Sequence, residues 1–261
     1  MILETLIAGC EPPHLRRVGL WCVWFVLLHI LGKFLGRYNR HIKSRPTVVG
    51  GTCHGVVTGW LALAVHTGVL DYTWWRTVGI PLSAGYLITD TVFYCFAKRD
   101  LPMVVHHMVM LIAHWCVGSV HASTIGGAGD PVWAVKVSAA GYLSELPNPS
   151  LNVRWFMTKM LTKHSVFFTI NNMYLLITWI GTRLVFMPFL VYTHVVPRYE
   201  DYAKVDGIHA YYTCIFFHFV IILMSLHWLV QLLKGGLQPL LVFDPKAVAL
   251  NPNMRDNVKT E

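Results

Sequence analysis

The sequence predicts an all-α multi-pass membrane protein, a bundle of about seven transmembrane helices within a range of about six to eight. Its composition is the first observation behind this. Of the 261 residues, 55% are hydrophobic and only 13% are charged, roughly half the charge of a typical soluble domain. The mean hydropathy is +0.50. These values exclude a disordered chain, a coiled coil and a disulfide-stapled module, and they count against an ordinary soluble enzyme.

The distribution of the charges is the second observation. A bilayer core is about 30 Å thick, and a helix needs about 20 apolar residues to span it. Seven apolar segments together hold 160 residues but only five of the 34 charges. These segments are 18–36, 48–70, 77–97, 102–122, 131–147, 165–196 and 207–233.

Two of the segments keep the helix count open. The segment 131–147 is short and carries two charges, so we expect it to be tilted or to lie inside the bundle. The segment 165–196 is long enough to break at Pro188 and to hold more than one element. The stretch 148–163 mixes apolar and basic residues, and it suits an interfacial helix lying on the membrane.

The chain divides into three parts along the sequence. Residues 1–44 form an N-terminal segment with the first transmembrane helix, residues 45–235 form the main helical domain, and residues 236–261 form a cytosolic tail. Asp100, two residues before Pro102, suits the start of a helix.

The basic residues predict an orientation. Between the segments, thirteen Lys and Arg side chains fall on one side of the membrane and five on the other. The positive-inside rule then places the N-terminus outside or in the lumen and the C-terminus in the cytosol, and an error of one span would reverse one end. The net charge of +8 is confined to the connecting segments, which indicates topology and anionic-lipid contact rather than a nucleic-acid partner.

Glycines recur at every fourth position in the first two segments. Gly51, Gly55 and Gly59 lie in the second segment, and Gly32 and Gly36 lie in the first. This spacing lets helix backbones approach closely. Packing within the chain is the favoured interpretation over a dimer motif.

Histidine is unusually frequent, with fourteen in the chain and eleven inside the apolar segments. His106 and His107 are adjacent, so they point about 100° apart on a helix. One of them could face a cavity while a neighbouring helix holds the other. His107, His114 and His121 form a stripe with steps of about 10 Å, which is too long for one metal ion to bridge. Because no HxxxH, HxxHH or HExxH motif occurs either, the sequence predicts no metal site.

Three charges inside the segments need a partner or a function, because an ionised side chain costs about 2.5–3.5 kcal/mol at the bilayer centre. They are Asp90, Glu145 and Arg183. A structural pair between Arg183 and one acid would offset the cost. Alternatively, an acid orients or polarises a histidine that acts as a base or nucleophile. Both interpretations remain open.

The order of these motifs resembles the TLC domain, which ceramide synthases, TRAM translocon proteins, the CLN-type neuronal lipofuscinosis protein and the TLC domain-containing (TLCD) proteins share. The resemblance covers about residues 45–235, and the chain looks most like the TLCD branch. The residues that carry it are the run Ser83–Asp90, Asp100, His106 and His107, the run Glu145–Arg154, Arg183 with Pro188, and His54.

The resemblance implies a helix bundle around a lipid-binding cavity and an acyl-transfer site. Carried over, His106 and His107 are the catalytic pair, with Asp90 and Glu145 as the supporting acids. The imidazole could accept an acyl group or deprotonate an amine or hydroxyl. Arg183 would be the partner of the acids or an anchor for an anionic headgroup. Further residues expected to contact the substrate are His54, Tyr86, Asp100 and His114.

The chain departs from the ceramide synthases, because their His-Asp-x-x-Asp pattern is missing and Ser144 and Glu145 stand there instead. The resemblance therefore implies a role in lipid homeostasis, with acyl transfer to a phospholipid or sphingoid acceptor, no bound cofactor, and acyl-CoA or a phospholipid as the donor. A non-catalytic lipid sensor, membrane organiser or cargo receptor is the alternative. A transporter is disfavoured because broken helices are not repeated. The endoplasmic reticulum is the expected location, with the plasma membrane as the alternative.

Overall fold

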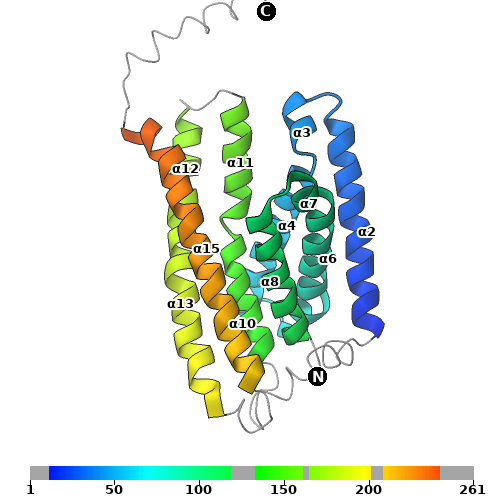
Figure 1. Ribbon diagram of the computed structural model, residues 1–261, viewed down its shortest axis with the longest axis vertical. Helices are drawn as coiled ribbons and strands as arrows, with labels where there is room; N and C mark the ends of the chain where they lie inside the picture. Colours follow the sequence, from blue (N-terminus) through cyan, green and yellow to red (C-terminus); the bar gives the residue numbers. More distant parts are fainter. Residues whose placement is uncertain (1–11, 119–132, 161–164, 201–207, 242–261) are drawn as a thin grey trace, which may run out of the picture.

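Long apolar helices run side by side through the protein (Figure 1), and the computed structural model describes residues 12–118, 133–160, 165–200 and 208–241. The described residues are helical or lie in short turns, so the protein is an all-α multi-pass membrane protein. Its helices are α2 (Pro12–Leu35), α3 (Arg40–Ser44), α4 (Val48–His66), α5 (Tyr72–Trp74), η1 (Trp75–Gly79), α6 (Ile80–Asp90), η2 (Thr91–Cys95), α7 (Phe96–Lys98), α8 (Leu101–Gly118), α10 (Trp133–Gly141), η4 (Tyr142–Glu145), α11 (Asn148–Lys159), α12 (Val166–Trp179), η5 (Ile180–Phe186), α13 (Met187–Leu190), η6 (Val191–Val195), η7 (Val196–Arg198) and α15 (Ile208–Leu241).

Helices occur in all seven segments that the sequence predicts. In the described part of the chain, five helices are long and apolar enough to cross a membrane: His14–Leu35, Val48–His66, Tyr72–Lys98, Val166–Arg198 and Ile215–Lys234. The apolar stretch of α8 is shorter. The three helices α10, η4 and α11 follow one another directly along the chain, and together they are called the rod below. The start of α2 and the end of α15 lie at opposite ends of the bundle (Figure 1), as an odd number of passes requires.

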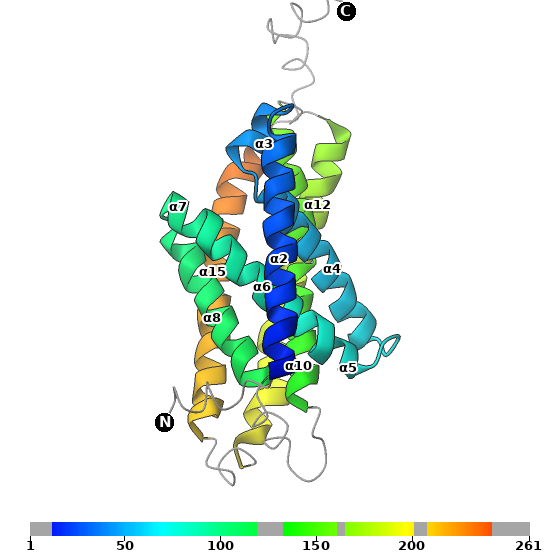
Figure 2. The ribbon, with the colours of Figure 1, turned by 90° about the vertical axis from the view of Figure 1, so that its right-hand side faces the viewer.

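The third span is the central one. Of its most apolar window, 61% is buried, against 22% for the first span and 11% for the last. Helix α2 packs along α6 and α4 (Figure 2). A Cβ atom at Gly85 of α6 would lie 2.6 Å from the Cβ of Trp21, so only glycine permits this close approach.

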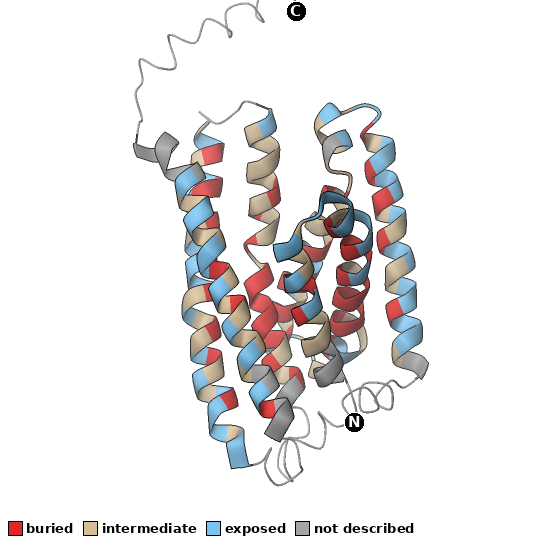
Figure 3. Ribbon diagram, in the orientation of Figure 1, coloured by how far each residue is buried: buried red, intermediate tan, exposed pale blue. Residues whose placement is uncertain are grey.

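The glycines at every fourth position of α4 face another part of the same chain, which confirms packing within the chain. A Cβ atom added at Gly55 or Gly59 would lie 3.1 Å from the side chain of Asn148 or Leu146, respectively. Helix α4 thereby comes close to the η4 and α11 part of the rod. Buried residues concentrate on this rod and on α6 (Figure 3), and the buried acid Glu145 is the last residue of η4.

The orientation of helix α11 differs from the one expected from the sequence. The stretch 148–163 was expected to lie on the membrane surface, but α11 stands upright between α4 and α12 (Figure 1). Asn152 Nδ2 donates to Thr52 Oγ1 of α4 at 3.0 Å, and Asn171 Nδ2 of α12 donates to the carbonyl of Ser150 at 3.0 Å. The polar face of α11 therefore serves contacts inside the bundle.

The long helix of segment 165–196 does not break at Pro188. A π-helical turn, η5 (Ile180–Phe186), precedes this proline, and the helix continues to Arg198. Proline lacks an N–H group and its ring crowds the preceding turn. A wider π turn makes room for the ring, so the helix crosses the proline as one element.

Candidate functional site

The two adjacent histidines of α8 have different surroundings. His106 lines a cavity, whereas His107 is 1% exposed and faces η2. Nδ1 of His106 is buried and has no hydrogen-bond partner within the described residues. One histidine therefore faces the cavity and a neighbouring helix holds the other, as the 100° offset between adjacent residues predicts.

Three side chains hold His107. Its Nδ1 lies 2.9 Å from Thr91 Oγ1 and 3.7 Å from Cys95 Sγ, and its Nε2 lies 3.9 Å from Asp90 Oδ2. The hydroxyl of Thr91 already donates its proton to the carbonyl of Leu87 at 2.6 Å. Because that proton is used, the Thr91 oxygen accepts the Nδ1–H of His107. The Nε2 of His107 then faces Asp90.

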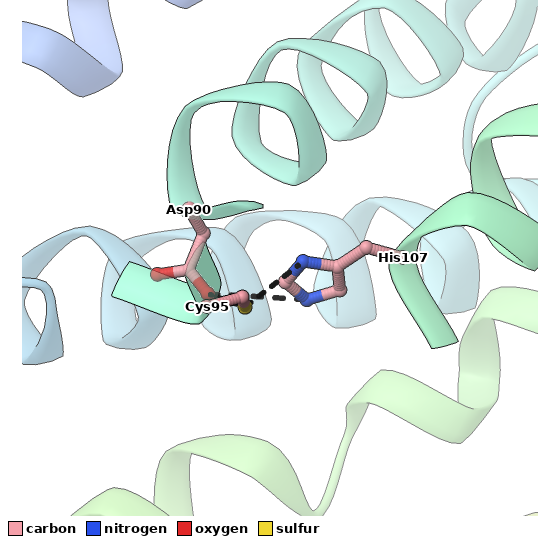
Figure 4. A group of neighbouring side chains, drawn as sticks. All are labelled: Asp90, Cys95 and His107. Atoms are coloured by element: carbon pink, nitrogen blue, oxygen red, sulfur yellow. Dashed lines mark hydrogen bonds and ion pairs between the residues drawn. The ribbon is translucent and has the colours of Figure 1, made fainter. Parts of the chain in front are cut away.

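A π-helical turn brings Asp90 and Cys95 together. Residues five apart point to different sides of an α-helix, but the wider turn of η2, with its i to i+5 hydrogen bonds, brings them to the same side. Cys95 Sγ lies 3.7 Å from Asp90 Oδ2, and His107 reaches both from α8 (Figure 4). Since π turns often occur at functional sites, we treat this group as the first polar network of the candidate site.

Glu145 and Arg183 form the second polar network. Arg183 Nη2 lies 3.6 Å from Glu145 Oε1, and Asn148 Nδ2 donates to Glu145 Oε2 at 2.5 Å. Arg183 also donates to the carbonyl of Ser144 at 2.9 Å and to Asn148 Oδ1 at 3.0 Å. Its guanidinium lies 4.3 Å from the centre of the Trp179 ring. A pair between Arg183 and one of the two acids is thereby confirmed.

Tyr86 and His54 lie between the two networks. Nδ1 of His54 lies 3.6 Å from Glu145 Oε2, and its Nε2 lies 3.3 Å from Ser83 Oγ. The Tyr86 ring stacks on His54 at 4.0 Å with an interplanar angle of 15°, and its centre lies 6.0 Å from that of His107. Aromatic contacts of this kind link the two networks through one tyrosine.

A cavity of ≈ 580 Å³ adjoins both networks. This is within the range of about 300–1,000 Å³ that is usual for small-molecule sites. Its wall combines aromatic, basic and acidic side chains with the imidazole of His106. The aromatic members are Tyr86, Tyr94, Trp155, Trp179 and Trp228, and the charged members are Arg45, Asp90, Asp100, Arg154 and Arg183.

The structure brings most of the predicted site residues together. Tyr86, Asp90, Asp100, His106 and Arg183 line the cavity, and the other predicted residues except His114 lie in the networks behind it. Oδ1 of Asp100 also accepts the backbone N–H of Met103 at 3.3 Å, so Asp100 starts α8 as expected. The side chain of His114 is outside the described residues.

Sequence reasoning missed several members of the site. Cys95 follows Asp90 by five residues, a spacing that carries no signal for an α-helix. Asn148 lies in the run Glu145–Arg154 that supported the family resemblance, and its position beside an intramembrane acid could have indicated a partner. Arg45 precedes the second apolar segment, where a cation is ordinarily interpreted as a topology signal.

One group in the described part of the chain could hold a metal ion. Asp90, Cys95 and His107 each offer one ligand atom, and these atoms lie within 4.8 Å of one another. Oxygen, sulfur and nitrogen are all zinc ligands. The hydrogen bonds of His107 with Thr91 and of Cys95 with Asp90 give these groups partners without a metal.

The chain belongs to the TLC domain family, because the family profile of the TLC domain matches residues 19–234. This match includes every residue of both polar networks and most of α2. No solved structure matches the chain. Together with the apolar helices, the family defines a multi-pass membrane protein that is associated with lipids.

Proposed function

We propose that this protein transfers an acyl group from a thioester donor to a lipid acceptor in the endoplasmic reticulum membrane, and that His106 is the reacting imidazole. The observation that carries the proposal is the buried Nδ1 of His106, which lacks a hydrogen-bond partner within the described residues and belongs to a side chain that lines the cavity. A buried nitrogen without a partner is costly to keep. A substrate group in the cavity would satisfy it.

The surroundings of the cavity suit an acyl-lipid substrate. Aromatic side chains provide apolar contact for a chain, and the rings of Trp228 and His106 pack edge to face with their centres 5.3 Å apart. Many apolar side chains of the helices are exposed, as is needed for contact with lipid chains in a bilayer. The TLC domain family is itself related to lipids.

In the proposed reaction, His106 acts as a general base. It takes the proton from the hydroxyl or amine of the acceptor lipid while that oxygen or nitrogen forms a bond to the carbonyl carbon of a thioester donor. The C–S bond then breaks, and the leaving thiolate takes the proton back from His106. No atom or electron remains unassigned, and no cofactor is required.

We assign different roles to the two networks. His107, held by Thr91 and Asp90, fixes the backbone of α8 and the neighbouring His106 ring, whose centre lies 5.6 Å away. Glu145 and Arg183 hold η4 and η5 together on the other side of the cavity. In this proposal, His107 and Asp90 are positioning residues, because their contacts are with protein groups.

The test is turnover by the purified full-length chain in lipid nanodiscs, with an acyl-CoA and either a lysophospholipid or a sphingoid base. We expect His106→Ala to lower the rate by about 10²–10⁴-fold, the usual contribution of a general base. His194→Ala is the control, because His194 is exposed and does not line the cavity. Full activity of His106→Ala would refute the proposal.

The same experiment addresses the alternative of a non-catalytic lipid sensor or carrier. Wild-type protein that retains a bound lipid but turns over neither acceptor would support that alternative. Acyl-chain profiles of cell membranes then provide a second measurement. If the protein is a sensor, its removal should change these profiles, whereas the His106→Ala variant should give the same profile as the wild type.

A further inference from the structure

The cavity wall carries two arginines that have no acidic partner within ion-pair distance. Arg183 pairs with Glu145, but the side chains of Arg45 and Arg154 form neither a hydrogen bond nor an ion pair with the described residues. Arg45 follows α3, and Arg154 lies on α11. Both line the cavity. Their N–H groups are therefore available to a ligand.

Arg45 is held in place by aromatic rings. Its guanidinium carbon lies 5.3 Å from the centre of the Tyr94 ring and 5.8 Å from that of Trp155. Its Nε is buried and has no hydrogen-bond partner among the described groups. Aromatic rings contact the face of a guanidinium, so the N–H groups in its plane can still donate hydrogen bonds to another group. Their fork geometry suits a phosphate or a carboxylate.

Acidic side chains lie on the same wall. Asp90 is engaged with Cys95 and His107, and Asp100 uses Oδ1 to start α8. The second carboxylate oxygen of Asp100 has no hydrogen-bond partner within the described residues and can accept a further hydrogen bond. Apart from Arg183, which pairs with Glu145, the wall therefore presents two cations and two anions, and it matches a ligand that carries both signs of charge.

We propose that this part of the cavity binds the headgroup of a zwitterionic phospholipid, with its phosphate on Arg45 and Arg154 and its ammonium group towards Asp100. Charge-assisted hydrogen bonds to phosphate are a preferred use of arginine. The inference rests on the proposed function and narrows it, because the acceptor becomes a lysophospholipid and the bound product becomes a diacyl phospholipid.

The position in the bundle supports this ligand. Arg45 directly follows α3, at the end of the bundle shown in Figure 1, and Arg37, Arg40 and Lys43 lie in or beside the same short helix. The positive-inside rule assigns this end to the cytosol. Phospholipids of the cytosolic leaflet have their phosphates on the cytosolic side of the bilayer core, which is the side that this rule assigns to Arg45.

The experiment measures which lipid the purified full-length chain retains. Nanodiscs contain equal amounts of phosphatidylcholine, phosphatidylglycerol and diacylglycerol with identical acyl chains, and mass spectrometry quantifies the lipid that stays bound after extraction in detergent. We expect wild-type protein to retain phosphatidylcholine over phosphatidylglycerol, because only the former has an ammonium group. Diacylglycerol, which lacks phosphate, should be retained least.

Variants test which side chains bind the phosphate and which bind the ammonium group of the headgroup. Arg45→Gln with Arg154→Gln should lower retention of both phospholipids by about tenfold, as expected for the loss of charge-assisted hydrogen bonds. Asp100→Asn should reduce only the preference for phosphatidylcholine, and asparagine still starts a helix. Arg40→Gln is the control, because Arg40 is exposed at the same end and does not line the cavity.

Two results would overturn this inference: unchanged phospholipid retention by the double arginine variant, or a wild-type preference for diacylglycerol. A thermal midpoint close to that of Arg40→Gln verifies that the double variant is folded, and single Arg45→Lys provides a milder test if it is not. Failure of acyl transfer has a different readout, since retention of phosphatidylcholine without turnover would refute the proposed reaction and leave the headgroup site intact.

Discussion

The two acids buried in the bundle have different kinds of partners. Glu145 has a permanent cation, an amide and an imidazole, with Arg183 at 3.6 Å, Asn148 at 2.5 Å and His54 at 3.6 Å. Asp90 has a thiol at 3.7 Å and an imidazole at 3.9 Å, and no arginine or lysine of the described chain lies within ion-pair distance. Both acids are almost fully buried.

This difference indicates a division of roles. A carboxylate with a permanent cation is compensated at every pH, so the network of Glu145 suits a structural link between η4 and η5. Asp90 has no permanent cation within ion-pair distance in the described chain, and its thiol and imidazole partners can themselves gain or lose a proton. We therefore expect the network of Glu145 to control stability and the network of Asp90 to control activity.

The largest effect is expected when the cation of the Glu145 network is removed. Arg183→Met leaves a buried carboxylate without its charged partner, which typically costs about 3–5 kcal/mol. We expect a strongly lowered thermal midpoint in detergent, or loss of monodisperse protein on size-exclusion chromatography.

The control for this variant removes both charges. Glu145→Gln combined with Arg183→Met should recover part of the lost stability, because neither charge is then buried alone. A single Arg183→Met variant as stable as the wild type would show that the pair contributes nothing to the fold.

A smaller effect on stability is expected at the other acid. Asp90→Asn keeps the size of the side chain and removes a buried charge that lacks an ion-pair partner, so the lost contacts are offset by a smaller desolvation cost. We expect the free energy of unfolding to change by no more than about 1 kcal/mol. Acyl transfer should fall nevertheless, because His107 loses the carboxylate that faces its Nε2.

Two measurements on the same purified sample check this prediction, the thermal midpoint and turnover in nanodiscs. If Asp90→Asn destabilised the protein as strongly as Arg183→Met, the two acids would have the same structural role and the proposed division would be wrong. Unchanged turnover would remove Asp90 from the positioning residues.

The sequence predicted those features that depend on local pattern or on the cost of a charge in lipid. The seven helical segments followed from hydropathy, and a pair involving Arg183 followed from the need to compensate an intramembrane charge. The different environments of His106 and His107 followed from the helical offset of adjacent residues. Which of the two acids pairs with Arg183 could not be predicted from the sequence, and the structure shows that it is Glu145.

Other features could not be predicted because they depend on deviations from regular geometry or on tertiary contacts. Cys95 approaches Asp90 only through the π turn of η2. The polar face of α11 gives the same sequence pattern whether it meets water or a polar cavity, so the stretch 148–163 was assigned to the membrane surface. Arg45 reaches the cavity only when the corner after α3 folds towards Trp155.

The smallest effect is expected from metal removal, which tests the nature of the Asp90 network. Its three candidate ligands already have partners, since Cys95 lies in hydrogen-bond contact with Asp90 and His107 donates to Thr91. We therefore expect less than stoichiometric zinc in the purified chain and an unchanged thermal midpoint after treatment with a chelator. Cys95→Ser should behave in the same way, because serine keeps a donor towards Asp90. Stoichiometric zinc that disappears in Cys95→Ser would instead make Asp90, Cys95 and His107 a metal site, and the difference between the two acids would then be that one binds an arginine and the other a metal ion.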